Sequence, residues 1–495
     1  MLRLIRKAVS DFKSCEILPD KKGEKMKSNR REFLKGAFWM GATAALAGCS
    51  TGALRISRPG GSMQGFAAAP LKKVRVGVIG LGRGFGGVKR MFQIPGTEVT
   101  AICDIVPRRI DRALEWCRKN GKKAPKVYTG NEEAWKKLCD SDDVDLVYNA
   151  TPWLLHTPIA LYAMNAGKHV AIEVPAALTL DDCWALVETA EKTRLHCMQL
   201  ENCCYGETEL LALNLARKGL LGDLIHGEAA YIHDLREYCY GKFDKEKGAG
   251  GYYDYWRLNY NKDHAGNQYE THGLGPICQY MNINRGDRFD YLVSVDSKQL
   301  SFEKYAKAKF GPDSWEGKMK VQMGNMNTTV IKTVLGRTIM VQHDVASPRP
   351  YSRLNLISGT KGILCDYPFR VALAKDEIES CHVFDKENGE KIRKEHMHPL
   401  WAQAGELAKK IGGHGGMDFL MDLRLSYCLQ NGLPLDMDVY DLASWCSLGE
   451  LTEKSARNRG CSLDVPDFTK GGWKTAKPLG IETIDMSKLD ISNIS

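Results

Sequence analysis

Two side chains that can transfer protons lie close together near the middle of the 495-residue chain. Tyr269 and His272 are three residues apart and would share one face of a helix that opens before Gly273. Histidine titrates near neutrality, and a tyrosine can act as a base if a neighbour lowers its pKa. We therefore predict that Tyr269 and His272 are the catalytic acid–base pair. The structural alternatives are packing of Tyr269 in an aromatic loop and a buried cap position for His272.

A glycine-rich turn predicts a nucleotide-phosphate site earlier in the chain. The apolar run Val74–Gly80 predicts a strand, and Gly82 and Gly84 follow it before a predicted helix. Gly80 permits a tight turn, and Gly82 lets backbone N–H groups approach a pyrophosphate at the helix N-terminus. The usual third glycine falls at Phe85, so the strict pattern fails, and a purely structural turn is the alternative.

An acidic residue at the end of the next predicted strand strengthens the prediction of a dinucleotide site. Asp104 ends the run Glu98–Asp104, twenty-two residues after Gly82. A carboxylate there accepts hydrogen bonds from the adenosine ribose hydroxyls and repels a 2′-phosphate. The pattern therefore predicts NAD rather than NADP as the cofactor.

Three further predicted strands end in residues that face the same crevice. They are Thr151–His156, Glu173–Pro175 and Glu201–Asn202. We group them because ligands of a parallel α/β sheet bind at the carboxyl ends of its strands. His156 also fits a neighbour of a helix N-cap, and Asn202 fits a cap of the helix that follows.

The elements that must position these residues alternate between strands and helices. Strand-like runs occur at Val74–Gly80, Glu98–Asp104, Val144–Ala150, His169–Pro175 and His196–Asn202. Helical stretches between them occur at Pro107–Lys119, Pro158–Ala166 and Leu180–Thr193. This alternation predicts an α/β domain over 74–203, with a doubly wound parallel sheet and right-handed crossovers.

After residue 203 the pattern changes to that of an α+β domain, which we assign to 204–495. A loop rich in Gly, Tyr and Trp follows at 238–270. Strand-like runs occur at Ile225–Ile232, Thr328–Val334, Thr338–His343 and Gly362–Asp366. Helical stretches occur at Glu207–Lys218, Leu400–Ile411 and Met417–Gln430. These elements predict a second domain built on a large open sheet.

The first 49 residues resemble an export signal. Arg30 and Arg31 precede the apolar stretch Ala37–Gly48, as in a twin-arginine signal, and Leu46–Cys49 resembles a lipobox. We therefore predict export by the twin-arginine route, acylation of Cys49, and a lipid anchor at the bacterial cell envelope as the only membrane contact. The alternative is a surface helix with an incidental arginine pair, and translation could start at Met1 or at Met26. Residues 50–73 are predicted to be a flexible tether.

Charge and cysteine usage exclude some classes of function. The net charge is +9, but the first 49 residues hold eleven Lys or Arg against five Asp or Glu. The remainder carries only about +3, which gives no basis for nucleic-acid binding. Of sixteen cysteines, those outside Cys15 and Cys49 show neither a CxxC pair nor a metal-site spacing. We expect buried free thiols and no metal; the oligomeric state, including a homo-oligomer, stays open.

The chain resembles the glucose-fructose oxidoreductase-like and inositol dehydrogenase-like proteins, which pair a Rossmann domain with an α/β domain on an open sheet. A closer resemblance is to glycoside hydrolase family 109, whose members are NAD-dependent α-N-acetylgalactosaminidases, often exported with twin-arginine signals. It covers about residues 74 to 465 and is carried by five runs: His196–Gly206, Ala230–Arg236, Thr271–Pro276, Tyr280–Asp287 and His414–Phe419.

The family resemblance implies two sets of contact residues. The implied NAD contacts are Arg83, Gly84, Asp104, Trp153, Leu154, Leu155, His156, Glu173, Val174 and Asn202. The implied sugar contacts are Tyr231, Arg257, Tyr269, Glu270, Thr271, His272 and Tyr351.

This chain departs from the family pattern at several positions. The glycine turn is one residue shorter, Leu155 replaces an aromatic residue, and the 238–268 loop is longer. Glu270 replaces a proline, which together with the longer loop indicates a shifted substrate preference. Val174 stands where the wider family has the lysine of Glu-Lys-Pro, which counts against alcohol dehydrogenation with a lysine acid/base.

An exported protein cannot draw on fresh NAD, so its chemistry must return the cofactor to its starting state. We find no carboxylate pair of the kind that ordinary glycosidases use. The resemblance instead implies removal of terminal α-linked N-acetylgalactosamine by transient oxidation at C3, elimination across C1–C2, water addition and re-reduction. The alternatives are a sugar oxidoreductase of the wider superfamily and a non-catalytic glycan-binding lipoprotein.

Overall fold

The computed structural model describes residues 60–384 and 386–485. The predicted signal over 1–49, including Cys49, lies outside the described residues. Within the described part, no helix is both long and apolar enough to cross a membrane.

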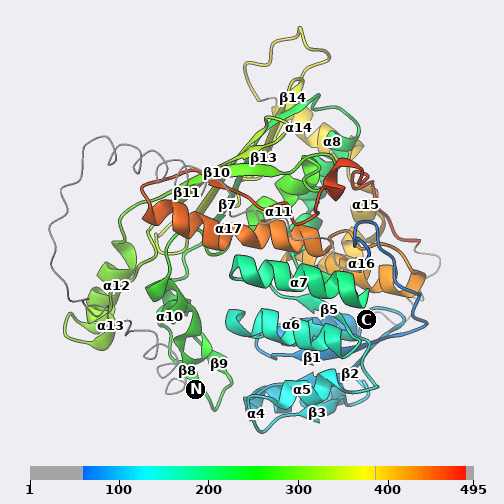
Figure 1. The fold of residues 1–495 in the computed structure, drawn as a ribbon, viewed down its shortest axis with the longest axis vertical. Helices are drawn as coiled ribbons and strands as arrows, with labels where there is room; N and C mark the ends of the chain where they lie inside the picture. Colours follow the sequence, from blue (N-terminus) through cyan, green and yellow to red (C-terminus); the bar gives the residue numbers. More distant parts are fainter. Residues whose placement is uncertain (1–59, 385, 486–495) are drawn as a thin grey trace, which may run out of the picture. The chain divides into compact units, whose positions relative to one another are not determined.

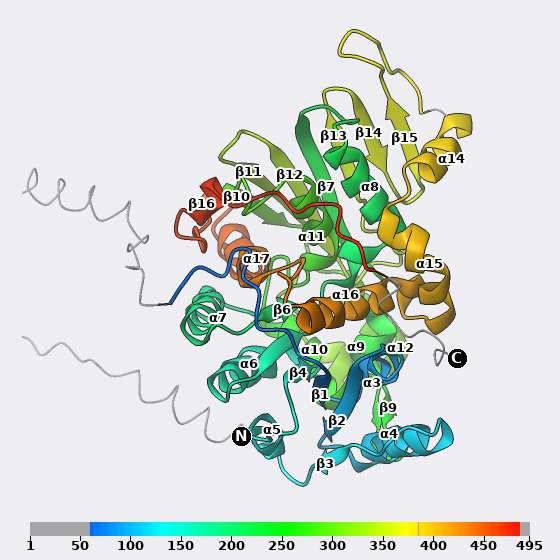
Figure 2. The same ribbon diagram turned by 90° about the vertical axis from the view of Figure 1, so that its right-hand side faces the viewer.

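A parallel six-stranded sheet forms the core of the first domain (Figure 1), with strand order β3-β2-β1-β4-β5-β6. Its strands are β1 Val74–Ile79, β2 Thr97–Cys103, β3 Lys126–Tyr128, β4 Leu146–Asn149, β5 His169–Ile172 and β6 Cys197–Gln199. Its helices are α3 Gly84–Met91, α4 Pro107–Lys119, α5 Ala134–Cys139, α6 His156–Asn165 and α7 Leu180–Thr193. Figure 2 shows α5, α6 and α7 on one face and α3 and α4 on the other. The predicted doubly wound sheet is confirmed; β3 and α5 were not predicted.

A mixed eight-stranded sheet forms the second domain, in the order β15-β14-β13-β7-β12-β11-β10-β16. The strands are β7 Leu224–Ile232, β10 Phe289–Asp296, β11 Asn327–Thr333, β12 Thr338–Asp344, β13 Leu356–Gly359, β14 Gly362–Cys365, β15 Arg370–Leu373 and β16 Leu463–Asp464. Only β7 and β12 pair in parallel, because the chain crosses over between them. The predicted α+β domain on a large sheet is confirmed.

The helices of the second domain contact both sheets. They are α8 Glu207–Arg217, α9 Arg236–Tyr240, α10 Trp256–Asp263, α11 Thr271–Tyr280, α12 Ser301–Phe310, α13 Trp315–Lys318, α14 Lys386–Glu395, α15 Pro399–Ile411, α16 Met417–Asn431 and α17 Val439–Arg457. Helix α11 packs on β7, α16 on α3, and α17 on α7 and β6. The 238–270 segment predicted as loop holds α10 and a hairpin of β8 Phe243–Asp244 and β9 Ala249–Gly250. Helix α17 was not predicted, because residues 439–448 are buried without a gap and leave no amphipathic period in its amino-terminal half.

The segment from Gly60 onward packs on the folded domains. The Met63 amide donates to the Tyr440 hydroxyl at 3.1 Å, and the Leu71 amide donates to the Leu429 carbonyl at 2.9 Å. The Phe66 ring lies 4.9 Å from the His196 ring. The prediction of a flexible tether over 50–73 therefore does not hold for residues 60–73.

The fourteen cysteines from Cys103 to Cys461 are all free in the described structure. All are buried except Cys381, which is exposed, and Cys461, which is partly exposed. The predicted pattern of buried free thiols is confirmed for these residues.

Candidate active site

The turn between β1 and α3 has the geometry of a phosphate-binding turn. Gly80 has φ +88°, and a Cβ there would lie 2.5 Å from the Ala150 carbonyl oxygen. A Cβ on Gly84 would lie 3.0 Å from the Ala150 Cβ and 3.1 Å from Val78, so Gly84 provides the close helix–sheet packing of the missing third glycine. No side chain caps α3, which leaves its first N–H groups available to an anion. These residues fit a bound dinucleotide.

Asp104 braces this turn from the end of β2. Its two carboxylate oxygens accept hydrogen bonds from the Leu81 amide at 2.7 Å and the Val106 amide at 2.8 Å. The Arg109 guanidinium lies 3.6 Å away. A carboxylate has about four lone-pair sites, so Asp104 keeps acceptor capacity for a ribose hydroxyl.

The end of β4 is held to the end of β5 by His156. Its ring nitrogens lie 2.7 Å from the carbonyl oxygens of Thr151 and Pro175, and the residue is 1% exposed. Burial lowers the pKa of His156, although the two carbonyl contacts oppose the shift. The structure therefore gives its side chain a role in joining two loops, and the implied NAD contact must come from the backbone here. The neighbouring Leu154 side chain is 70% exposed, whereas Val174 is buried.

Asn202 is held by residues that the sequence analysis did not single out. Its amide donates to Asp418 at 2.6 Å, and Asp418 also contacts His414 at 2.9 Å and Arg90 at 3.4 Å. Burial raises the pKa of Asp418, but the His414 hydrogen bond and the Arg90 charge outweigh it and keep the carboxylate ionised. Arg90 bonds Asp422 at 2.6 Å, which ties α3 to α16. Residues of α16 in the second domain thus fix the positions of α3 and Asn202, next to the predicted cofactor site.

Glu173 and Arg83 are two ionisable side chains near the predicted nucleotide turn, and each shifts the pKa of the other. Burial raises the pKa of Glu173, although the Arg83 charge opposes the shift. Arg83 experiences the fields of Tyr252, Tyr269 and Glu173, and these raise its pKa despite the opposing effect of burial. Arg83 is therefore a fixed positive charge beside the predicted nucleotide turn.

Aromatic side chains gather around the end of β7, and we call this group the aromatic wall. The Tyr231 ring, from the end of β7, lies 4.5 Å from Tyr269, 5.4 Å from His272 and 6.1 Å from Tyr351. Arg257 lies 4.7 Å from the Tyr269 ring and 4.8 Å from the Trp153 ring. The structure thus brings together most of the sugar contacts that the resemblance implies.

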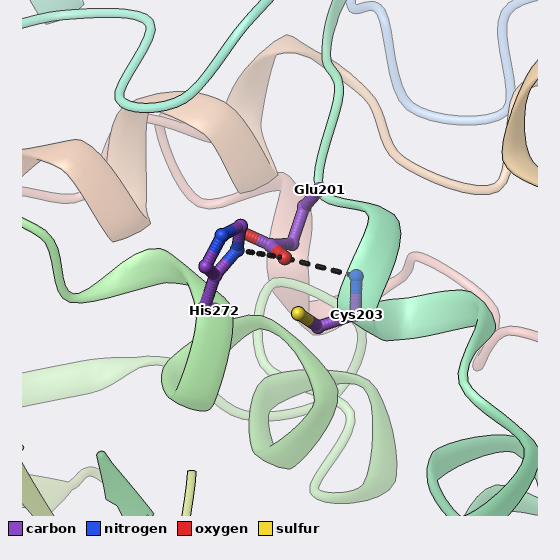
Figure 3. A group of neighbouring side chains, drawn as sticks. All are labelled: Glu201, Cys203 and His272. Atoms are coloured by element: carbon purple, nitrogen blue, oxygen red, sulfur yellow. Dashed lines mark hydrogen bonds and ion pairs between the residues drawn. The ribbon is translucent and has the colours of Figure 1, made fainter. Parts of the chain in front are cut away.

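His272 is oriented by a buried carboxylate. Its Nδ1 lies 2.8 Å from Glu201 Oε1, which also accepts the Cys203 amide at 3.1 Å (Figure 3). Glu201 is fully buried, yet the charge and hydrogen bond of His272 outweigh burial and lower the Glu201 pKa. A base held by a third group is the arrangement that activated sites use. Sequence reasoning grouped Glu201 only as a strand end; the signal was an acid directly after β6.

Glu201, Cys203 and His272 are spaced like the ligands of a metal site, but their protonation does not suit metal binding. One ligand atom each from Glu201, Cys203 and His272 lie within 4.8 Å of one another. Burial raises the pKa of the Cys203 thiol well above its usual range, whereas metal ligation requires a thiolate. The cluster fits an oriented imidazole better than a metal centre.

Gly273 permits α11 to lie directly on β7. A Cβ at this position would lie 2.3 Å from the Ala230 amide nitrogen. This close approach brings the Tyr269 and His272 rings, 4.9 Å apart, against Tyr231. Tyr269 and His272 lie close together as predicted, but α11 begins at Thr271, so Tyr269 precedes the helix and the two residues do not share a helix face.

Tyr269 does not meet the condition that the sequence analysis set for a base. Burial and the neighbouring Tyr231 raise its pKa well above the usual range, and the Arg257 charge does not offset them. Burial likewise raises the pKa of Tyr231 to about 12. Both phenols stay protonated near neutrality and can only donate a proton or a hydrogen bond.

Two of the implied sugar contacts lie away from the aromatic wall. Glu270 is 1% exposed and lines a separate cavity with Tyr260 and Cys446, and Thr271 is fully buried. Consecutive positions at the start of α11 point in different directions, which explains why the run does not act as one contact surface. Tyr351 remains 37% exposed at the rim, where its hydroxyl accepts a hydrogen bond from Arg353 at 3.1 Å.

Comparison with solved structures shows which fold the chain has. An NAD binding oxidoreductase from Klebsiella pneumoniae aligns with a TM-score of 0.60 and 16% identity, over 80% of this chain and 100% of that one. A levoglucosan dehydrogenase in complex with NADH aligns with a TM-score of 0.56 and 20% identity, over 80% and 100% of the two chains. A family model described as oxidoreductase family, NAD-binding Rossmann fold matches residues 74–200. The chain is therefore an NAD-binding protein with this oxidoreductase fold.

The particular family follows from the second domain. A model described as glycosyl hydrolase 109, C-terminal domain matches residues 205–475. A glycosyl hydrolase family 109 protein of Shewanella pealeana is 47% identical over 466 residues, or 92% of this chain and 99% of the relative. An alpha-N-acetylgalactosaminidase of Shewanella oneidensis is 47% identical over 460 residues, or 92% and 98% of the two chains. The chain belongs to glycosyl hydrolase family 109.

Proposed function

We propose that the protein hydrolyses glycosides with a terminal α-linked N-acetylgalactosamine, using NAD bound at the β1–α3 turn. The observation that carries the proposal is the imidazole of His272, oriented by Glu201 and facing an aromatic wall in a protein with an NAD-binding domain. The name of the Shewanella oneidensis relative supports this choice of sugar.

NAD supplies reversible oxidation of the sugar at C3 and ends each turnover unchanged, so glycoside and water give free sugar and an alcohol. Gly80, Gly82 and Gly84 would hold its pyrophosphate, Asp104 its adenosine ribose, and Arg83 would add positive charge beside the turn. Asn202 and Glu173 contribute polar groups on this side of the cleft.

His272 is the base in this proposal. A C3 ketone acidifies the C2 proton, and Nε2 of His272 accepts it while Nδ1–H donates to Glu201. The C1–oxygen bond then breaks as a C1–C2 double bond forms. Water adds at C1, and the proton returns to C2.

Two further groups serve the substrate. Tyr269 keeps its proton, so it donates to a substrate oxygen, including that of the departing alcohol. Arg257 has an Nε–H without a protein partner, which suits an acetamido or hydroxyl oxygen.

An aryl α-N-acetylgalactosaminide in heavy water tests the proposal. We expect release of the aryl alcohol without added reductant and deuterium at C2 of the free sugar. Hydrolysis without C2 exchange would refute the redox route. Stoichiometric accumulation of oxidised sugar would favour a sugar oxidoreductase instead, and sugar binding by protein that carries no nucleotide would favour a glycan-binding role.

We also propose that the protein is exported and lipid-anchored through Cys49. The support is the sequence alone: Arg30, Arg31 and the lipobox-like Leu46–Cys49. Fractionation of cells tests it with two variants. Cys49→Ala should release the protein from membranes, and replacing both arginines by lysine should leave it inside the cell. Unchanged membrane attachment of the Cys49→Ala variant would refute the anchor.

A further inference from the structure

A cavity with a volume of 240 Å³ lies next to the candidate active site. Its walls come from the starts of α6 and α7, from α10 and from α17. Trp153 lines this cavity and also stacks against Tyr269, with ring centroids 5.7 Å apart. The volume exceeds that of a single water site many times over, so a small organic molecule fits.

Two buried acceptors in this cavity have no partner in the protein. Oε1 of Glu270 and Oε1 of Gln268 make no hydrogen bond, although the residues are only 1% and 5% exposed. Buried polar groups are nearly always hydrogen-bonded, because an unmade bond leaves the desolvation cost uncompensated. Both residues line the cavity, so a donor placed there would satisfy them.

The charge of the lining favours a cation. Besides Glu270, the carboxylates of Asp182, Glu450 and Glu453 line the cavity, whereas no Lys or Arg is among its described lining residues. Glu450 and Glu453 already have partners: the Leu180 amide at 2.6 Å and His264 at 2.9 Å. Asp182 is only partly buried, so Glu270 is the fully buried carboxylate of this lining with an oxygen left for a ligand.

The remaining wall is aromatic and apolar, which favours an organic cation over a metal ion. Trp153 and Tyr260 offer ring faces, and Pro175, Ala177 and Leu178 offer apolar surface. An ammonium group gains from aromatic faces, whereas hard metal ions require a shell of oxygen ligands. We propose that this cavity binds a small organic molecule with a protonated amino group, which donates to Glu270 and Gln268.

Calorimetric titration of the full-length, NAD-loaded protein tests the site directly, and it does not depend on the glycosidase proposal. The titration is run at about pH 9, where Glu270 is ionised and the n-butylammonium probe keeps its proton, and n-butanol is the neutral counterpart. We expect n-butylammonium to bind about tenfold more tightly than n-butanol, because hydrogen bonds to charged partners are the stronger ones. An equal concentration of sodium ion should not displace it.

Two variants assign the binding to this cavity. Glu270→Gln keeps the side-chain volume, and we expect about a tenfold loss of n-butylammonium affinity from the lost charge. Gln268→Leu removes the second acceptor and should weaken binding severalfold, so it decides the matter if Glu270→Gln does not fold. Glu132→Gln, at an exposed position, should change nothing.

Several outcomes would overturn the proposal. They are equal binding of the amine and the alcohol, displacement by sodium, no heat with either probe, and an affinity unchanged by Glu270→Gln or, where that variant does not fold, by Gln268→Leu. No heat with either probe would mean that the cavity holds only water. Loss of glycosidase activity has no bearing on these results, so the two proposals fail separately.

Discussion

Two buried glutamates near the start of α11 differ sharply in their electrostatic state. Glu201 and Glu270 are at most 1% exposed, so both pay a similar desolvation cost. The imidazole of His272 lowers the pKa of Glu201, whereas burial without a cationic partner raises the pKa of Glu270 to about 8. Burial alone therefore does not decide the charge of a carboxylate; its partner does. His272 is the cationic partner of Glu201, whereas no described residue plays this part for Glu270.

The largest expected effect on activity comes from removing His272, the partner of Glu201. His272→Ala should lower kcat on an aryl α-N-acetylgalactosaminide by roughly 10³- to 10⁴-fold, because it removes the proposed base. Steady-state kinetics measure it, and His226→Ala, on the second sheet, serves as the control. A loss of less than tenfold would remove His272 from the proposed mechanism.

The next largest effect should come from a substitution that moves α11 away from β7. Gly273→Ala places a Cβ 2.3 Å from the Ala230 amide nitrogen, so α11 must move. We expect a loss of about 1–3 kcal/mol in the free energy of unfolding, together with lower activity. Denaturant unfolding measures it. Gly389→Ala is the control, since its Cβ would have only ordinary contacts at 3.7 Å; equal effects would contradict the argument.

Glu270, which has no cationic partner, should make the free energy of unfolding depend on pH. A folded pKa of about 8 lies above the unfolded value, so the folded state holds the extra proton and Glu270 stabilises it at low pH. That stability is lost as pH rises from the unfolded pKa to the folded value of about 8, at roughly 1.4 kcal/mol per pH unit, and it does not fall further above that value.

Glu270→Gln should flatten this pH dependence and leave the variant more stable than the natural protein under alkaline conditions. Melting temperatures across the pH range measure it, with Glu132→Gln as the matched loss of an exposed charge. Parallel curves for the natural protein and Glu270→Gln would show that Glu270 is already ionised or already paired.

The smallest effect should come from neutralising the paired glutamate. Glu201→Gln keeps an acceptor for His272 Nδ1 but loses the charge that stabilises the protonated imidazole, so kcat should fall about tenfold with KM little changed. Glu201→Ala, which also removes the acceptor, should cost more. Equal kcat for all three proteins would exclude a positioning role.

The cofactor side of the molecule was the more predictable one. Strands β1, β2 and β5 begin within one residue of the predicted positions, because a buried parallel strand is a short apolar run with clear ends. The glycine turn and Asp104 directly follow β1 and β2, so predicting these strands also predicted where the turn and Asp104 lie.

The substrate wall depends on pairings that no local pattern specifies. Tyr231, His272 and Glu201 come from β7, α11 and the segment after β6, and they meet only once both sheets are assembled. The amino-terminal half of α17, residues 439–448, is buried around its whole circumference and therefore has no polar face to mark it. The separate environment of Glu270 was equally hidden, since it depends on α10 and α17.

The docking of the amino-terminal segment sets a limit on where the enzyme could work. The described fold begins at Gly60, eleven residues after Cys49. A fully extended chain spans at most roughly 3.6 Å per residue, so an acylated Cys49 would keep Gly60, where the described chain begins, within about 40 Å of the bilayer. Under the proposed anchoring, the substrates within reach are glycans that approach the membrane surface. Soluble oligosaccharides would have to diffuse to it.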